Sequence, residues 1–324
     1  MLPPPRPDLA RSFERSHPGA TLLPIVGDAS ARRFFRLSPP GGMSRVVMDY
    51  GAPFEGETDD IRLARVFEAA SLRVARILEP RPEPGCLVME DLGDTMLEAV
   101  LLTGDPATGR SLHEKAVELT RAIAVGGTAA LEGSERAGGP ALDADRFRFE
   151  MDYFLEHYAG GFLRVTPVPA SLREILHALA DRAASGPRVL CHRDFHSRNL
   201  MVVGADLAMV DIQDARWGPD TYDLASLLRD AYVDVDEAFV GSVIGRLDDD
   251  ARARFEIVAA QRMLKALGTF GYQVGALGRR RYAPAIVRTL ARLRRVLPRS
   301  GVLEPVHREL TGAGLLATPS GLEG

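Results

Sequence analysis

The feature that most constrains the fold is a segment near residue 200 in which polar residues flank a short hairpin pattern. Two four-residue apolar runs, at 200–203 and 207–210, are separated by a Gly-Ala-Asp turn. Apolar runs joined by such a turn are typical of an antiparallel hairpin, whose two ends come back together. Asn199, just before the first strand, and Asp211, just after the second, are therefore expected about 5 Å apart.

The residues around this hairpin suit phosphoryl transfer. Asp194 stands five residues before Asn199, in a loop introduced by His192 and Arg193. An amide oxygen and a carboxylate make a hard-oxygen site that suits Mg²⁺. A further carboxylate beside a metal-bound nucleotide can accept a hydroxyl proton and orient the attacking oxygen. A His-x-Asp triplet alone is an ordinary turn, but the whole combination favours Asp194 as a base and Asn199 and Asp211 as Mg²⁺ ligands.

The same residues resemble a known catalytic loop. The run HRDFHSRN at 192–199 resembles the H-x-D-x-H-x-x-N loop of the aminoglycoside phosphotransferases. Residues 210–230 resemble the metal-binding aspartate segment of that family and the helix start that follows it. The resemblance implies ATP and Mg²⁺ as cofactors, with Asp194 as the catalytic base and Asn199 and Asp211 as the metal ligands.

Two further residues receive supporting roles. Asp223 matches the buried aspartate that braces the catalytic loop in that family, and His192 is interpreted as structural because a Mg²⁺ kinase needs no imidazole ligand. Asp211 and Asp223 are only twelve residues apart, whereas protein kinases place a long activation segment between the corresponding positions. This spacing leaves no room for a peptide platform and predicts a small-molecule acceptor.

Hydrophobic patterning divides the chain into two parts. Short β-like runs alternate with Gly and Pro early in the chain, at 21–26, 32–37, 45–50 and 85–91, with one helical stretch at 59–70. Helical spacing then dominates, at 110–131, 144–158, 171–184, 222–231, 236–246, 250–274 and 284–296. With the resemblance, this predicts an α+β bilobal protein-kinase-like fold: a nucleotide-binding N-lobe at 1–91, a catalytic and substrate-binding helical C-lobe at 92–324, and ATP between them. The first seven residues and the tail after Leu315 are expected to be disordered.

Two segments of the N-lobe are predicted to bind the nucleotide. The strand–turn–strand pattern at 26–37 is typical of a loop over phosphates, because small residues let backbone N–H groups approach them. Residues 86–93 resemble the hinge strand between kinase lobes, whose backbone would bond adenine. The predicted nucleotide-binding residues are Gly27, Ala29, Ser30, Arg32, Arg33, Glu90, Asp91 and Leu92.

The strand at 45–50 departs from the usual kinase pattern. Kinase-like folds carry a lysine there that holds the α- and β-phosphates, but Met48 stands near that position and no lysine precedes Lys115. Either Arg32 or Arg33 is expected to supply the positive charge, because a guanidinium can grip phosphate through two nitrogens. The sequence does not assign the acidic partner of that cation.

This departure narrows the resemblance to one group, the cell-wall sugar kinases. Three further segments of the chain also resemble that group: GDASARRFFRL, MEDLGD and QRMLKALGTF. That family acts at the anomeric carbon of N-acetylmuramate and N-acetylglucosamine in peptidoglycan recycling, which implies an amino-sugar acceptor. A cation on the helix around 261–270 could meet a lactyl carboxylate, although an amphipathic helix with solvated charges fits the same pattern. The substrate candidates are Gln213, Gln261, Arg262 and Lys265.

Composition limits the partners and the compartment. The 324 residues carry a net charge of −4, which does not favour nucleic acid or an anionic membrane as a partner. Two cysteines form no disulfide framework, and no secretory signal or long apolar run is present, so a cytoplasmic protein is expected. Two alternatives remain: a kinase for another hydroxyl compound such as an aminoglycoside, which the basic C-terminal helices oppose, and a nucleotide-binding pseudokinase, which only Met48 supports.

Overall fold

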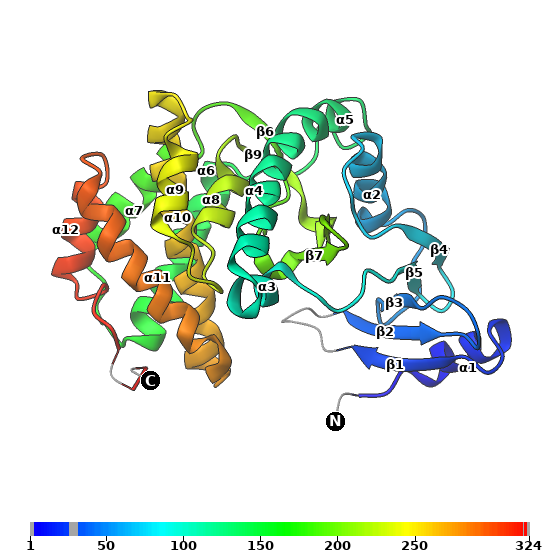
Figure 1. Cartoon of the computed structure of the whole chain (residues 1–324). Helices are drawn as coiled ribbons and strands as arrows, with labels where there is room; N and C mark the ends of the chain where they lie inside the picture. The colour runs from blue at the N-terminus through cyan, green and yellow to red at the C-terminus, as the bar shows by residue number, and fades with distance from the viewer. Residues whose placement is uncertain (1–2, 26–31, 320, 323–324) are drawn as a thin grey trace. The chain divides into compact units, whose positions relative to one another are not determined.

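The chain divides into two compact units. The computed structural model describes residues 3–25, 32–319 and 321–322. The first unit comprises Met1–Thr95 with Met201–Asp214, and the second comprises Met96–Leu200 with Ala215–Gly324 (Figure 1). The first unit thus includes residues 201–214, which the sequence assigns to the helical lobe.

A five-stranded antiparallel sheet forms the first unit, in the order β1-β2-β3-β5-β4. Its strands are β1 (Thr21–Ile25), β2 (Arg33–Ser38), β3 (Arg45–Asp49), β4 (Ile77–Arg81) and β5 (Cys86–Glu90). The four predicted strands are confirmed to within two residues at each end, and β4 was not predicted. The unit also holds the hairpin of β7 (Leu200–Val203) and β8 (Asp206–Met209), which confirms the hairpin predicted there.

The two faces of the sheet are covered by different helices. Leu9 and Phe13 of α1 (Pro7–Ser16) pack against Phe35, Val47 and their neighbours. On the opposite face, Met48 packs with Ile61 of α2 (Asp59–Ala69). Consecutive strand residues point to opposite faces, so Val47 and Met48 belong to different cores.

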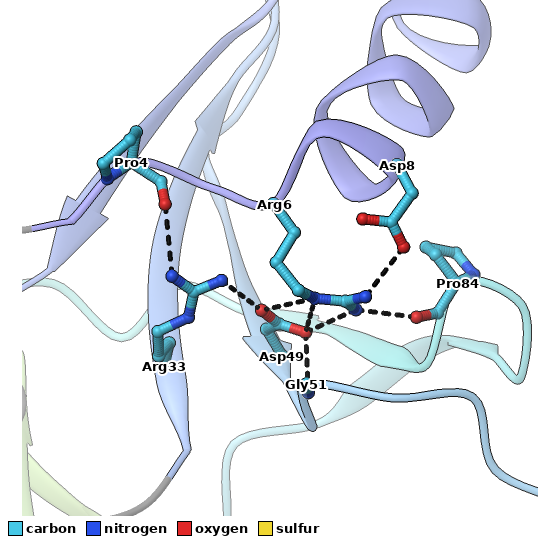
Figure 2. Close-up of polar contacts among 7 residues, drawn as sticks. All are labelled: Pro4, Arg6, Asp8, Arg33, Asp49, Gly51 and Pro84. Carbon is cyan, nitrogen blue, oxygen red and sulfur yellow. Dashed lines mark hydrogen bonds and ion pairs between the residues drawn. The ribbon is translucent and has the colours of Figure 1, made fainter.

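The prediction that the first seven residues are disordered is wrong for Pro4 and Arg6, as Figure 2 shows. Arg6 Nη2 donates to Asp49 Oδ1 at 2.8 Å, and Arg33 Nη2 donates to Asp49 Oδ2 at 3.0 Å. Arg33 Nη1 also donates to the Pro4 carbonyl at 3.2 Å, and the Gly51 N–H donates to Asp49 at 2.9 Å. The buried Asp49 carboxylate therefore ties the start of the chain to the sheet.

The C-terminal tail is also ordered beyond Leu315, contrary to the prediction. Leu315 and Leu316 are buried. Arg294 Nε donates to the Leu316 carbonyl at 2.6 Å, and Arg294 Nη2 donates to Thr318 Oγ1 at 2.7 Å. Apolar burial and one arginine thus hold this segment.

Helices dominate the second unit, and the predicted helical segments are confirmed with small shifts of their ends. The α-helices are α3 (Leu97–Thr103), α4 (Pro106–Ala122), α5 (Thr128–Glu132), α6 (Ala144–Phe154), α7 (Ala170–Ala183), α8 (Tyr222–Leu228), α9 (Glu237–Ile244), α10 (Asp249–Gly271), α11 (Ala283–Val296) and α12 (Glu304–Gly312). The wide turns η1 (Ile123–Gly127), η2 (Leu155–Phe162) and η5 (Tyr272–Ala276) extend α4, α6 and α10. Two short antiparallel strands, β6 (Arg188–Cys191) and β9 (Arg216–Pro219), were not predicted, nor were α3 and α12.

Two glycines allow α10 to approach its neighbours closely. A Cβ added at Gly268 would lie 2.9 Å from Phe154 Cα, and one at Gly271 would lie 2.8 Å from Tyr158 Cα. Real Cβ atoms do not tolerate such distances to backbone, so glycine is required for this packing of α10 on α6 and η2. The packing fixes the position of the polar residues that α10 carries one to two turns earlier.

Within the described residues, no helix is both long enough and apolar enough to cross a membrane.

Candidate active site

Buried carboxylates hold the backbone of the loop that carries Asp194. Asp223, in the first turn of α8, accepts hydrogen bonds from the backbone N–H groups of His192 at 2.6 Å and Arg193 at 3.0 Å. Asp230 accepts from the Ser197 N–H at 2.8 Å. His192 is fully buried. The predicted supporting residues His192 and Asp223 thus meet at the start of the loop, whereas Asp230 was not predicted.

The backbone at Arg193 is strained and clamped from both sides. Its φ angle is +82°, a conformation that costs free energy for any residue with a Cβ. Asp223 accepts from the Arg193 N–H, and Arg262 Nη1 of α10 donates to the Arg193 carbonyl at 2.9 Å. The guanidinium of Arg262 also lies over the Tyr222 ring, 4.5 Å from its centroid. These contacts maintain a strained turn directly before Asp194.

Positive charges surround the Asp194 carboxylate. Lys265 Nζ lies 3.3 Å from Asp194 Oδ1, and Arg262 Nη2 lies 3.9 Å from the same oxygen. The Asp194 side chain remains 26% exposed, so it can meet a ligand. Burial alone would raise the pKa of Asp194, but Lys265, Arg262 and Arg193 outweigh burial and hold that pKa well below its usual value. Asp194 is therefore ionised at neutral pH.

Asn199 is oriented by the same loop. It ends the 3-10 turn η3 (Ser197–Asn199), and its side-chain Nδ2 donates to the Asp194 carbonyl at 2.8 Å. Because the nitrogen end of the amide is engaged in this way, the oxygen end is the one presented to a ligand. This orientation fits an amide that offers an oxygen to a cation.

Asp211 follows β8 in the first unit. Its φ angle is +63°, so Asp211, like Arg193, has a left-handed backbone. Its side chain is exposed, and Gln213 Nε2 donates to Asp211 Oδ1 at 2.8 Å. The predicted substrate residue Gln213 thus contacts the predicted metal ligand. Asn199 and Asp211 belong to different units, and their shared binding of Mg²⁺ stays a prediction.

No cluster of three or more His, Cys, Asp or Glu side chains suited to a metal occurs within the described ranges. A nucleotide-bound Mg²⁺ uses one or two protein carboxylates together with phosphate oxygens and water. The donor set expected here, one carboxylate and one amide oxygen, fits that kind of ion.

The predicted nucleotide-binding residues have different surroundings. Gly27, Ala29 and Ser30 lie outside the described residues. Arg32 Nη1 donates to Asp60 Oδ1 at 3.1 Å, whereas Arg33 contacts Asp49 and Pro4. Asp60 was not predicted as a site residue, because its partner lies 28 positions away in the sequence.

The hinge residues are partly engaged within the first unit. The Glu90 carboxylate accepts from Arg73 at 2.5 Å and from Arg76 at 3.2 Å, and the Glu90 N–H donates to the Arg76 carbonyl at 2.9 Å. The Asp91 carboxylate accepts from Arg36 Nε at 2.7 Å. Because the Glu90 N–H has an internal partner, the following residues, Asp91 and Leu92, are the better candidates for contacts to adenine.

The three substrate candidates on α10 differ in exposure. Gln261 is fully buried and donates to Glu150 Oε2 at 2.8 Å, which is a packing role rather than a substrate contact. Arg262 is 9% exposed and is held by Arg193. Lys265 retains 19% exposure of its side chain beside Asp194. Helical spacing alone could not separate these three roles.

Comparisons with known proteins identify the family. Residues 21–257 match the phosphotransferase enzyme family. The N-acetylmuramate/N-acetylglucosamine kinase of Neisseria meningitidis serogroup B is 31% identical over 90% of this chain and 91% of its own. The enzyme of the same name from Pseudomonas aeruginosa is also 31% identical, over 94% of this chain and 91% of its own.

A solved structure supports the fold. The aminoglycoside phosphotransferase APH(2'')-Ib with ADP bound matches with a TM-score of 0.58, covering 83% of this chain and 91% of that one at 11% sequence identity. The predicted kinase-like α+β fold is thereby confirmed. Together with the family match over residues 21–257, these likenesses show that the chain belongs to the phosphotransferase enzyme family.

Proposed function

We propose that this protein is an ATP-dependent kinase that phosphorylates the anomeric hydroxyl of N-acetylmuramate and N-acetylglucosamine, as in the recycling of cell-wall sugars. The observation that carries the proposal is the clamped, ionised Asp194 in a chain that matches kinases of that name over nine-tenths of its length. Nucleotide use is supported by the family and by the ADP-bound neighbour.

In the proposed reaction, Asp194 accepts a hydrogen bond from the sugar hydroxyl and orients its oxygen toward the γ-phosphorus. A bond forms between the sugar oxygen and that phosphorus, the bond to the bridging oxygen breaks, and ADP leaves. The hydroxyl proton passes to Asp194 and then to solvent. Since the pKa of Asp194 is held low, the carboxylate is a weak proton acceptor, which suits a loose transition state in which the proton leaves late. Orientation of the hydroxyl is therefore its main contribution.

Asn199 and Asp211 would hold the Mg²⁺ of the bound nucleotide. When bound, the ion would neutralise charge on the phosphate oxygens. The carboxylate of Asp211 is exposed, and the amide of Asn199 is turned by its bond to the Asp194 carbonyl. Gln213 would restrain Asp211 through their mutual hydrogen bond rather than touch the sugar.

Lys265 is the cation best suited to meet the acceptor. Arg262 is committed to the Arg193 carbonyl and the Tyr222 ring, so its displacement would release a strained turn. Lys265 is a compact charge on a flexible stem, and it can keep Asp194 in place while offering a donor to a sugar oxygen or to the lactyl carboxylate. A carboxylate acceptor would then bind more tightly than its neutral counterpart.

The proposal is tested by incubating the purified protein with Mg-ATP and a panel of amino sugars and aminoglycosides, with phosphorus NMR to follow the products. Coupling of the new phosphate to an anomeric proton with either proposed sugar is the expected result. The Asp194→Asn variant serves as the blank, because a contaminating kinase would survive that change.

The other outcomes separate the alternatives. If an aminoglycoside is phosphorylated and no sugar is, the protein is a kinase with a different acceptor from the one proposed. Binding of ADP without product from any acceptor would contradict the kinase proposal and favour a nucleotide-binding pseudokinase.

A further inference from the structure

The first unit lacks a cation at the strand position where kinase-like folds place a lysine. Met48 stands near this position, on β3, and is 3% exposed. It packs with Leu87 of β5 and Ile61 of α2. An apolar side chain so enclosed can bind no phosphate, and any replacement cation must come from a neighbouring segment.

Arg33 begins β2 and Arg32 directly precedes it, and the contacts of the two side chains lie on opposite faces of the sheet. Arg33 pairs in register with Asp49, and its guanidinium lies 5.4 Å from the centroid of the Phe35 ring, on the face covered by α1. There it bonds Asp49 and the Pro4 carbonyl (Figure 2). Arg33 therefore belongs to the network that ties down the start of the chain.

Arg32 lies on the face covered by α2. Its Nη1 donates to Asp60 Oδ1 at 3.1 Å, and its guanidinium lies 5.5 Å from the centroid of the Tyr50 ring. Asp60 is only 6% exposed, and its second oxygen accepts from the Tyr50 hydroxyl at 2.7 Å. Asp60 is thus fixed by two partners and in turn fixes the direction of Arg32.

The acidic partner of Arg32 also lies near the predicted metal ligand of the same unit. The 3-10 turn η4 (Ile212–Asp214) directly follows Asp211 and packs against α2. Burial raises the pKa of Asp60, and the negative charge of Asp211 adds to that rise, so the two carboxylates are within electrostatic reach. A guanidinium has five N–H donors in a planar fork that matches phosphate oxygens, so Arg32, whose direction is set by Asp60, is a suitable phosphate-binding cation.

We propose that Arg32 is the residue that binds the α- and β-phosphates of the nucleotide, and that Asp60 and Tyr50 are its positioning residues. The proposal rests on the nucleotide use included in the proposed function. An Arg–Asp pair thereby takes the place of the lysine and its acidic partner on the following helix, in an arrangement that leaves Met48 free to pack.

The test measures binding of ADP and of adenosine to the full chain by calorimetry, with no acceptor present. Arg32→Gln is expected to weaken the binding of ADP by about ten- to 100-fold, because charge-assisted hydrogen bonds to the phosphates are lost. Adenosine has no phosphates, so its affinity should stay unchanged and also report that the variant is folded. Arg32→Lys should recover part of the lost ADP affinity. Asp60→Asn should weaken ADP binding less than Arg32→Gln does.

Arg65→Gln is the matched control, because Arg65 is an exposed arginine of α2 that pairs with Glu57. Unchanged ADP affinity in Arg32→Gln would overturn the proposal, as would an equal loss of ADP and adenosine. A large loss of ADP affinity in Arg33→Gln with adenosine retained would assign the role to Arg33 instead. Because no acceptor is used, these results are independent of whether the protein phosphorylates a sugar.

Discussion

Two buried aspartates, one in each unit, are satisfied in opposite ways. Asp49 in the first unit is 1% exposed and accepts from two arginines, Arg6 and Arg33. Asp223 in the second unit is 5% exposed and accepts from the backbone N–H groups that begin the proposed catalytic loop. The first carboxylate joins distant segments by charge, whereas the second sets the conformation of one strained turn.

The pKa values of the two groups move in opposite directions. Burial pushes the pKa of Asp49 up, but Arg6, the Gly51 N–H and Arg33 together bring it below its ordinary value. Burial raises the pKa of Asp223, and neither its two backbone donors nor His192 reverses the rise. The difference indicates that Asp49 serves stability, whereas Asp223 carries an electrostatic cost that the geometry of the loop requires.

Asp49→Asn should give the largest effect, a loss of about 2–3 kcal/mol in the free energy of unfolding. The loss is moderated because Arg6 and Arg33 are partly exposed. Since the folded pKa of Asp49 is depressed, its contribution is present above the unfolded pKa and is lost as pH falls through the folded pKa, so the gap to the wild type should narrow in acid. Urea unfolding at several pH values measures this. Asp8→Asn, which removes a more exposed partner of Arg6, is the control and should cost under about 0.5 kcal/mol.

Asp223→Asn should act mainly on turnover. An asparagine presents an N–H₂ group to one of two backbone N–H donors, so one bond at the Arg193 turn is lost and kcat should fall about ten- to 100-fold. Asp220→Asn removes only a pair with Arg254 near the surface and serves as the control. If Asp223→Asn lowered stability as much as Asp49→Asn and left kcat intact, the contrast between the two aspartates would fail.

Gly268→Ala should lower the free energy of unfolding by about 1–3 kcal/mol, because the added methyl meets the backbone of Phe154. Gly241→Ala on α9 is the matched control: nothing lies within 4 Å of its Cβ, and alanine should stabilise that helix by up to about 1 kcal/mol. Thermal unfolding of both variants gives the comparison. Destabilisation by Gly268→Ala without destabilisation by Gly241→Ala would show that close packing of α10, rather than helix propensity, decides the effect.

Lys265→Met should produce the smallest effect, a displacement of the pH profile. Burial raises the pKa of Asp194, and Lys265 is the foremost of the charges that overcome this. Without Lys265 the pKa of Asp194 rises, so Asp194 becomes protonated at a higher pH. The acid limb of the kcat–pH profile therefore moves to higher pH. Lys115→Met on α4 provides the control. An acid limb that stayed in place would show that Arg262 and Arg193 alone set the charge state of Asp194.

Local patterns predicted much of the fold, including the hairpin that follows the proposed catalytic loop. The alternating strands and the hairpin around the Gly-Ala-Asp turn were readable, because their signals lie within a few residues of one another. By contrast, α1 was missed: a ten-residue helix after a Pro-rich start gives a weak signal until Leu9 and Phe13 meet the sheet.

Long-range partnerships in the site could not be predicted in the same way. The pairing of Arg32 with Asp60, of Arg262 with the Arg193 carbonyl, and of Gln261 with Glu150 joins residues that the sequence separates by 28, 69 and 111 positions. Residue type and local pattern made Arg32, Arg262 and Gln261 candidates, but they did not reveal the partners of these side chains. Only the tertiary structure separates those that are buried in packing from those that keep exposed polar atoms.

The position of Lys265 has a practical consequence for chemical labelling. The chain contains only two lysines, Lys115 and Lys265, and the second lies 3.3 Å from Asp194. Apart from the N-terminal amine, an amine-directed reagent therefore has only two side chains to modify, one of them in the proposed active site. Without engineered residues, a fluorophore or an isotopically marked methyl group introduced by such a reagent would place a spectroscopic reporter beside the proposed base.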